Sequence, residues 1–283
     1  MSGFSNVRAY VDAINGGRAS TCSIRKVPSQ ATTASWWADL SMAAGNPKPN
    51  YYASSPLSAA TLSGLDGIYH GTDKSPEQLY LAEWMLTTPT AGLVGQYRLL
   101  DYLLYYPFVD LDDGDPQTMD NTVTLPRYTD GDGVQVMMVA AAPTTGGGRF
   151  TFDYINQDGA AKTSPVQFCS VAAANIASLV TSEPATAANG APFLRLASGD
   201  SGVRQIASVT NSVLNGGLAA LVLVKPLASH VIREVNTPSE INYVSQVPGC
   251  PRVYDGAYLG MIMQCAATIA AGTLAGRMNF AWS

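Results

Sequence analysis

Hydrophobic and polar residues alternate with a period of two in the second half of this chain. The clearest case is 149–155, where Phe150, Phe152 and Tyr154 fall on one face and polar residues on the other. Successive side chains of an extended strand point to opposite faces, so this pattern predicts a half-buried antiparallel strand.

Two further candidate strands flank this one, at 134–139 and 166–169, and turn-forming residues that include Gly146–Gly148 separate the three. Neighbouring strands joined by short glycine-containing turns commonly pair, so the segment predicts a β-meander. Strands at 218–224 and 258–263 are apolar on both faces and are expected to lie centrally or under another layer. The remaining candidate strands are 193–197, 203–209 and 241–247.

Two segments before residue 108 show helical spacing instead. Ser75, Pro76 and Gln78 form a helix-start signature, with a capping serine, a proline at the first helical position and a capping-box glutamine. A helix is therefore expected from there to about Leu86. A second is predicted from the spacing of Leu93, Tyr97, Leu100 and Leu104, ending at Tyr106-Pro107.

These elements predict a β-rich α+β fold. The expected body is an antiparallel β-sandwich or barrel, with a jelly-roll-like arrangement among the options, plus two short helices and an extended N-terminal arm. The arm covers 1–35, a loop and helical region covers 36–108, and the β-sandwich or barrel domain covers 109–283. Alternatively, 36–283 forms a single domain.

Composition adds a functional expectation, because charged residues make up only 13% of the 283 residues. Typical soluble domains carry roughly a quarter. A surface of small and hydroxyl-bearing side chains loses its water at low cost, which favours extensive contact with other subunits. The net charge of −5 argues against a direct nucleic-acid partner. No secretory signal or membrane span is expected.

The four cysteines, Cys22, Cys169, Cys250 and Cys265, are widely scattered and form no C-x-x-C pair. They are expected to be buried, unpaired thiols in a reducing compartment, with no zinc and no other cofactor.

Gly199-Asp200-Ser201-Gly202 resembles the nucleophile motif of trypsin-like serine proteases, with His70 upstream. A serine nucleophile needs a histidine within hydrogen-bond reach and an aspartate that orients it. The residue after the motif is Val203, where that family has glycine, and His70 lacks the family's Ala-Ala-His-Cys context. A tight turn between two strands is the favoured interpretation, and a serine hydrolase remains an alternative.

The acidic loop Asp110–Asp115 offers carboxylates of the kind that calcium prefers, but it lacks the terminal glutamate of an EF-hand loop. Solvated acidic residues are the favoured interpretation, and calcium binding stays open.

Aromatic and proline residues cluster before residue 53. Paired aromatics serve as core or interface anchors more often than as sugar platforms, so an interface is favoured over a carbohydrate-binding receptor module. The interface residues expected on this basis are Trp36, Trp37, Pro47, Pro49, Tyr51 and Tyr52.

Four segments resemble stretches of tailed-bacteriophage virion proteins: GNPKPNYY at 45–52, DGIYHG at 66–71, LPRYTDGDG at 125–133 and LVKPL at 223–227. The resemblance implies a non-catalytic virion subunit made in a bacterial cytoplasm. Within a particle, a capsid decoration protein that bridges capsomers is favoured over a tail-tube, connector or major capsid component. The expected partners are the major capsid protein or other virion proteins, together with further copies of the chain, a trimer being one option.

Overall fold

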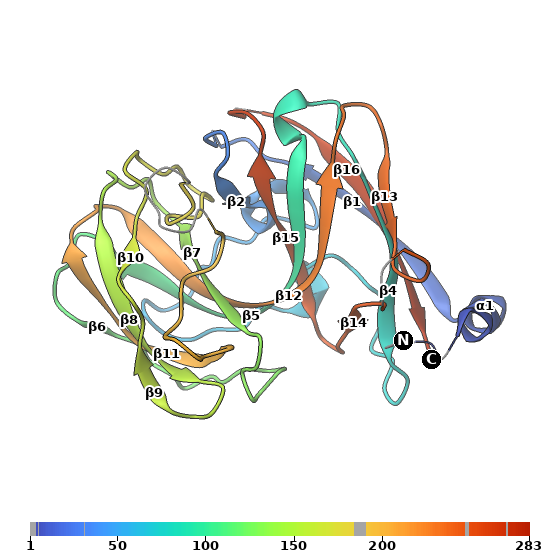
Figure 1. Ribbon diagram of the computed structural model, residues 1–283, viewed down its shortest axis with the longest axis horizontal. Helices are drawn as coiled ribbons and strands as arrows, with labels where there is room; N and C mark the ends of the chain where they lie inside the picture. Colours follow the sequence, from blue (N-terminus) through green and yellow to red (C-terminus); the bar gives the residue numbers. More distant parts are fainter. Residues whose placement is uncertain (1–3, 5, 31, 184–190, 247–248, 270) are drawn as a thin grey trace.

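The chain folds into antiparallel β-sheets. The structure, a computed structural model, describes residues 4, 6–30, 32–183, 191–246, 249–269 and 271–283. Among these residues it contains three sheets, three short 3-10 turns and one α-helix, α1 (Val7–Asn15). The predicted β-rich class is therefore confirmed (Figure 1).

The central sheet has the strand order β2 (Trp37–Asp39), β15 (Tyr258–Cys265), β5 (Gly95–Asp110), β12 (Leu218–Ile232) and β7 (Gln135–Ala140). Its two edge strands are joined by the segment 177–180. The Leu179 amide donates to the Trp37 carbonyl of β2, and the Ala140 amide of β7 donates to the Ser178 carbonyl, both at 2.9 Å. The sheet is thereby closed into a small barrel, which covers the outer edges of β2 and β7.

Apolar side chains from the barrel strands, the closing segment and the connection after β2 fill the barrel interior, which includes Trp37, Met42, Tyr52, Leu100, Tyr102, Val139, Leu179, Val222 and Ile262. Alternate residues of the same strands point outward into two other hydrophobic clusters. Strands β12 and β15 are thus buried on both faces over 218–224 and 258–263, as the sequence predicts.

Two further sheets pack on the outside of the barrel. The terminal sheet has the order β13 (Ser239–Asn242), β4 (Leu79–Thr87), β16 (Leu274–Trp282), β1 (Ala19–Val27) and β3 (Ala44–Asn46), with β14 (Arg252–Val253) beside β4. The distal sheet has the order β10 (Gln167–Phe168), β8 (Arg149–Asn156), β11 (Val203–Val213) and β6 (Gln117–Thr118), with β9 (Ala161–Thr163) beside β8.

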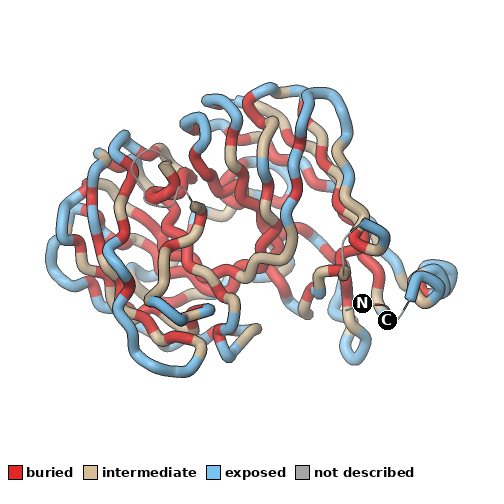
Figure 2. The backbone as a smooth tube through the Cα atoms, viewed as in Figure 1, coloured by how far each residue is buried: buried red, intermediate tan, exposed pale blue. Residues whose placement is uncertain are grey.

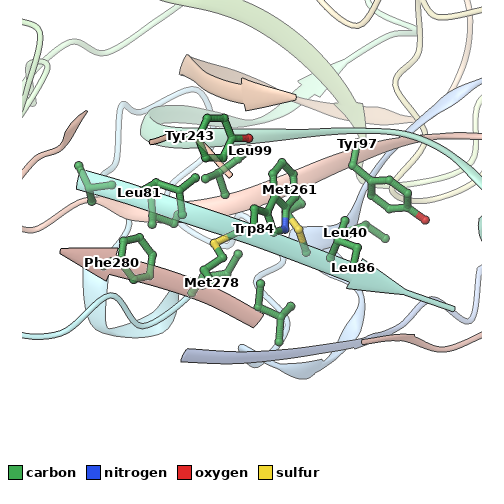
Figure 3. Packing of buried hydrophobic residues seen from close by; sticks show 14 of the residues in the cluster. Leu40, Leu81, Trp84, Leu86, Tyr97, Leu99, Tyr243, Met261, Met278 and Phe280 are labelled. Carbon is green, nitrogen blue, oxygen red and sulfur yellow. The ribbon is translucent and has the colours of Figure 1, made fainter. Parts of the chain in front are cut away.

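Each outer sheet has its own hydrophobic contact with the barrel. Figure 3 shows the terminal-sheet cluster, in which Trp84 of β4 lies among Met278 of β16 and Met261 of β15. Phe152 of β8 belongs to the distal-sheet cluster with Leu104 of β5. The long strands β5 and β12 contribute to both clusters, so both outer sheets rest on the same two strands (Figure 1).

The helix predicted after Ser75 is wrong, because Leu79–Thr87 forms strand β4. Opposite β16 the pairing runs from Glu83–Asn279 to Leu81–Phe280, which leaves Ala82 as an extra, bulged residue. A bulge reverses which face the following residues occupy. Leu81 and Trp84 therefore reach the same core although they are three apart, a spacing that imitates a helix.

The second predicted helix is also wrong, because it falls on β5. Pairing with β12 shifts between Tyr102 and Leu104, and again near Phe108, which has a φ of 58°. Leu100 therefore points into the barrel and Leu104 into the distal cluster. The helical spacing again arose from irregularities in a long strand.

The predicted meander is only partly present. β8 pairs with β10, whereas β7 belongs to the barrel and pairs with β12, so Gly146–Gly148 crosses between two sheets. The 193–197 segment forms no strand, although the Leu194 amide donates to the Val136 carbonyl. At 241–247 the strand β13 ends at Asn242, and Val247 lies outside the described residues.

The predicted extended arm is wrong for the residues described. Val7–Asn15 is helical, with the Asn6 side chain accepting from the Ala9 amide at 2.9 Å, and 19–27 forms β1 inside the terminal sheet. Burial alternates at the end of β1, where Ile24 and Lys26 are buried and Ser23 and Arg25 are exposed. The boundary expected at 108/109 falls within β5.

Candidate assembly surface

Three of the six predicted interface residues belong to the protein's own core. Trp36, Trp37 and Tyr52 are 2%, 3% and 1% exposed. Trp36 precedes β2 and packs in the distal-sheet cluster, whereas Trp37, the first residue of β2, packs in the barrel interior. The prediction that these three side chains contact a partner is wrong, and they offer no exposed platform for a sugar.

The other three predicted interface residues, Pro47, Pro49 and Tyr51, lie in the connection between β3 and the barrel. Pro47 is buried and its carbonyl accepts from the Lys26 ammonium at 2.8 Å, while Pro49 is half-buried. Tyr51 is 59% exposed and lies at the edge of a cavity of about 390 Å³ whose wall includes Leu40, Met42 and Ile176. An interface role for Pro49 and Tyr51 stays a prediction.

A fully buried carboxylate, Asp39, lies at the end of β2. It accepts hydrogen bonds from the Tyr102 hydroxyl at 2.8 Å, from the Ser41 amide at 2.8 Å, from the Ser41 hydroxyl at 2.7 Å and from the Tyr52 hydroxyl. Burial raises the pKa of Asp39, and these donors offset part of the rise. The signal in the sequence is a lone aspartate in the apolar stretch 36–43.

Lys26 is a second buried charge near this network. Its ammonium donates to the carbonyls of Ala43 at 3.1 Å and Pro47 at 2.8 Å, and only 2% of the residue is exposed. Burial lowers the pKa of Lys26 to about 8, and the charge of Asp39 opposes that change. The two hydrogen bonds of Lys26 tie β1 to the residues just before and just after β3.

Asp101 of β5 has a cationic partner, unlike Asp39. The Arg127 guanidinium donates to both carboxylate oxygens, at 2.8 and 2.7 Å, and also to the carbonyl of Gly256 at 3.0 Å. The Asp101 side chain is completely buried and that of Arg127 is 10% exposed. On β5, Asp101 lies between Leu99, which belongs to the terminal-sheet cluster, and Leu104, which belongs to the distal-sheet cluster.

The Gly199–Gly202 motif forms a turn before β11, as the favoured interpretation expects. The Ser201 hydroxyl donates to an Asp132 carboxylate oxygen at 2.6 Å, and Asp200 accepts from Tyr154 and Asn156. His70 lies elsewhere, its Nε2 bonded to the Ala257 carbonyl at 3.0 Å. Serine and histidine are not brought together as a nucleophile and base would require.

In the acidic loop after β5, aspartate side chains accept hydrogen bonds from backbone amides of the same loop. Asp110 accepts from the Asp112 amide and Asp113 from the Asp115 amide, both at 2.9 Å. No group of three or more histidine, cysteine or acidic side chains is arranged to hold a metal within the described part of the chain. Calcium binding at this loop stays open.

Helix α1 presents apolar side chains to solvent. Val7, Val11 and Ile14 are 54%, 45% and 43% exposed and stand four and three residues apart, which places them on one stripe. The opposite side of the helix packs on the terminal sheet through Ala13. In Figure 2 most of the helix has the colour of exposed residues. Sequence reasoning missed this helix, although Asn6 and the spacing of the three residues signal it.

The strand that follows α1 has an open edge. β1 pairs with β16 over Ala19–Lys26, but on its other side the ladder with β3 covers only Arg25–Val27 among the described residues. The open part, 19–24, contains neither a charged residue nor a proline. Natural proteins usually protect such edges with those residues.

These two features are adjacent. The Arg18 amide donates to the Ala13 carbonyl at 2.8 Å, so the end of α1 is fixed against the start of β1. Figure 1 shows both at the same end of the molecule. We call α1 together with the open edge of β1 at 19–24 the assembly surface.

A scan against protein-family models finds no match, and a search of curated proteins finds none. Two solved structures with weak similarity are viral capsid proteins. The infectious bursal disease virus VP2 subviral particle is 9% identical, with 93% of this chain and 80% of that chain covered and a TM-score of 0.17. A mutant VP2 of that virus in T=1 particles is 10% identical, with coverages of 93% and 78% and a TM-score of 0.16. Scores this low do not indicate a shared fold.

The described residues include no helix with the length and hydrophobicity that a bilayer crossing requires. The four cysteines are all free, three of them buried and Cys22 partly so, as the sequence predicts.

Proposed function

We propose that this chain is a non-catalytic structural subunit of a tailed-phage particle, most specifically a decoration protein that bridges capsomers and stabilises the head. The observation that carries the proposal is the assembly surface, where an apolar helical stripe and an unprotected strand edge occur at the same end of the molecule. A protein that stays monomeric rarely leaves both uncovered. The low charge content and the resemblance to phage virion segments support the same function.

The proposed mechanism is mechanical. In a body made of a closed barrel with a sheet on each side, antiparallel hydrogen-bond ladders join the strands of each sheet. Burial of apolar and small polar area between such bodies adds free energy to contacts between capsomers. The proposed partners are the major capsid protein or other virion proteins, and further copies of this chain.

The test is to purify particles through a density gradient, wash them with salt and count this chain by quantitative mass spectrometry. Cryo-EM of the same particles then locates it. A decoration protein is expected in tens to hundreds of copies on the head, whereas density in the tail or at the portal would favour the tail-tube or connector alternative. Density forming the shell itself would favour a major capsid protein. Absence from washed particles overturns the proposal.

The hydrolase alternative has a separate test. A fluorophosphonate probe reacts with serines activated by a neighbouring base. We expect no labelling of Ser201, because its hydroxyl is bonded to Asp132 and no histidine contacts it among the described residues. Labelling of the wild-type chain that is lost in both Ser201→Ala and His70→Ala would contradict a non-catalytic function.

A further inference from the structure

We propose that Arg98, at one end of the barrel, binds a carboxylate group, and that this group is an acidic side chain of a partner protein. The inference rests on the proposed structural function and names the chemistry of one contact that this function would use. Three observations support it: the aromatic rings around the guanidinium, its lack of a carboxylate partner within the described part of the chain, and the hollow beside it.

Arg98 lies on the face of β5 that lines the barrel interior. Its cross-strand neighbour on β15 is Ile262, which belongs to the barrel-interior cluster, as does Leu100 two residues along β5. On β12 it pairs with Ser229, which lies beyond Val224, the last residue of β12 that pairs with β7. Strand β7 does not reach this level, so Arg98 stands at one end of the barrel.

Two aromatic rings contact the guanidinium. Its Cζ lies 5.1 Å from the centre of the Trp37 ring and 5.4 Å from the centre of the Phe193 ring. Trp37 is the first residue of β2, and Phe193 precedes Leu194, whose amide donates to the Val136 carbonyl of β7. Cation–π contacts use the charge of a guanidinium but none of its five N–H donors. The rings therefore hold the cation in place and leave its donors for another group.

No group of the described chain pairs with this guanidinium. Within the residues that the structure describes, no carbonyl accepts a hydrogen bond from it and no carboxylate forms an ion pair with it. Arg98 is half-buried, and burial lowers its pKa without a carboxylate to oppose the change. Asp101, the nearest acidic residue along β5, already accepts from Arg127 on both oxygens. A carboxylate from outside the chain would offset the cost of the partly buried charge.

An open hollow of about 370 Å³ adjoins Arg98, and its wall is the stretch 226–229 of β12. Pro226, Leu227 and Ala228 are apolar and half-buried, and Ser229 is exposed. Arg98 is the one charged residue among the described residues that line this hollow. The hollow therefore offers apolar surface to an aliphatic stem, next to a single cation and a hydroxyl donor.

The ligand that fits these features is one carboxylate on a short aliphatic stem. The fork of guanidinium N–H groups matches the two oxygens of a carboxylate, and the Ser229 side chain lies on the same face of the sheet because Ser229 pairs with Arg98. Nucleic acids are bound by several basic groups, whereas this hollow has one. A free small molecule would stay largely exposed here, although ligand pockets bury most of their ligand. A glutamate or aspartate side chain, held in place by its own protein, is the ligand these points favour.

NMR titration of the arginine side chains tests the site directly. The Nε–H resonance of Arg98 is assigned from its loss in Arg98→Lys, and the probe is glutamate blocked as N-acetyl and methylamide, whose only charge is the side-chain carboxylate. The probe is expected to shift the Arg98 resonance saturably, at a concentration at least roughly fivefold below that needed for Arg149. Arg149 is a matched internal control, because it is exposed and contacts one ring, that of Phe168, at 5.1 Å. The blocked glutamine analogue is neutral and should cause no shift.

Variants at Phe193 test the role of the aromatic rings. Phe193→Leu removes one ring at a half-buried residue and should weaken binding of blocked glutamate about two- to fivefold, whereas Phe193→Tyr keeps a ring and should bind as the wild type does. The inference is overturned by any of four results: no saturable shift, an equal response of Arg98 and Arg149, tighter binding of inorganic phosphate than of blocked glutamate, or unchanged binding in Phe193→Leu.

Particles then test whether the carboxylate comes from a partner protein. Arg98→Gln removes the charge and should lower the number of copies on salt-washed particles at least about twofold, and Arg98→Lys, which keeps the charge and loses the fork, should lie between it and the wild type. Arg149→Gln is the matched control and should leave the copy number unchanged. Full occupancy by Arg98→Gln would overturn the inference and leave the proposed function standing. A wild-type chain that binds blocked glutamate but is absent from particles would leave the carboxylate site standing and remove the proposed function.

Discussion

At the scale of single residues, two buried aspartates are stabilised by different means. Asp101 has a cation, Arg127, which donates to both of its oxygens. Asp39 receives only neutral donors, three hydroxyls and one amide, while the nearby Lys26 ammonium donates to carbonyls instead. Removing the partner therefore has a different consequence at each site.

Arg127→Met should lower the free energy of unfolding by about 3–5 kcal/mol, because it leaves the Asp101 carboxylate buried without its cation. The double variant with Asp101→Asn should lose less than Arg127→Met alone, since no unpaired charge remains. Urea denaturation of the wild type, both single variants and the double variant measures this coupling. A loss below about 1 kcal/mol in Arg127→Met would show that the ion pair does not matter for stability.

The raised pKa of Asp39 predicts a pH dependence. The folded chain keeps this proton at pH values where the unfolded chain has lost it, so stability falls as pH rises from about 4 through the raised pKa. In the Asp39→Asn variant the side chain does not titrate in this pH range. The difference in free energy of unfolding, wild type minus Asp39→Asn, should decrease between pH 4 and 7 by up to about 1.4 kcal/mol per pH unit.

Urea denaturation at several pH values between 4 and 7 measures this difference. Lys26, whose pKa is about 8, stays mainly protonated throughout this range. Wild-type and Asp39→Asn curves that run parallel would mean that the carboxyl group is ionised throughout the range. Tyr51→Phe, at an exposed residue outside the network, is a matched control for a single lost polar group.

At the scale of elements, the sequence predicted β8, whose alternation is regular, and failed at β4 and β5, where bulges interrupt the alternation. Arg149–Asn156 was predicted well because its pairs with β11 keep Phe150, Phe152 and Tyr154 on the core side. In β4 the extra residue Ala82 turned a period of two into spacings of three and four. A bulge depends on the partner strand, so a single sequence does not reveal it.

The candidate assembly surface, too, could be predicted from the sequence only in part. Aromatic residues at 36 and 37 indicated important contacts, but only the fold shows that both side chains are buried in the protein's own core. The α1 stripe was visible as spacing, whereas the open edge of β1 depends on how short β3 is. The spacing of residues in a sequence does not show which distant segments pair with each other.

Gly202→Ala tests whether the Gly199–Gly202 turn is structural. A Cβ at Gly202 would overlap the Gly131 carbonyl oxygen, because two loops meet there backbone to backbone. We expect a loss of more than about 2 kcal/mol in free energy of unfolding. At Gly114 a Cβ would find its nearest neighbour, Leu214 Cδ2, at 3.8 Å, so Gly114→Ala should change stability by less than about 0.5 kcal/mol. Equal effects would indicate that the loops separate easily.

At the scale of the whole molecule, both outer sheets depend on one barrel. Strands β5 and β12 run from the distal-sheet cluster to the terminal-sheet cluster, and the segment 177–180 closes the barrel between β2 and β7. Loss of either outer sheet would expose an apolar face of these strands. We therefore expect the two outer sheets, which lie on opposite sides of the barrel in Figure 1, to unfold together.

We accordingly expect one cooperative unfolding transition, which the buried thiols can report. Cys169 belongs to the distal-sheet cluster and Cys265 to the terminal-sheet cluster, and burial raises the pKa of both. Neither should react with a thiol reagent until the fold opens. Pulse labelling through a urea series, read by mass spectrometry at each cysteine, should give the same urea midpoint for both cysteines, and this midpoint should match that of global unfolding in urea followed by circular dichroism. Separate midpoints would show that one outer sheet leaves a stable barrel behind, and β5 and β12 would then not couple the two ends.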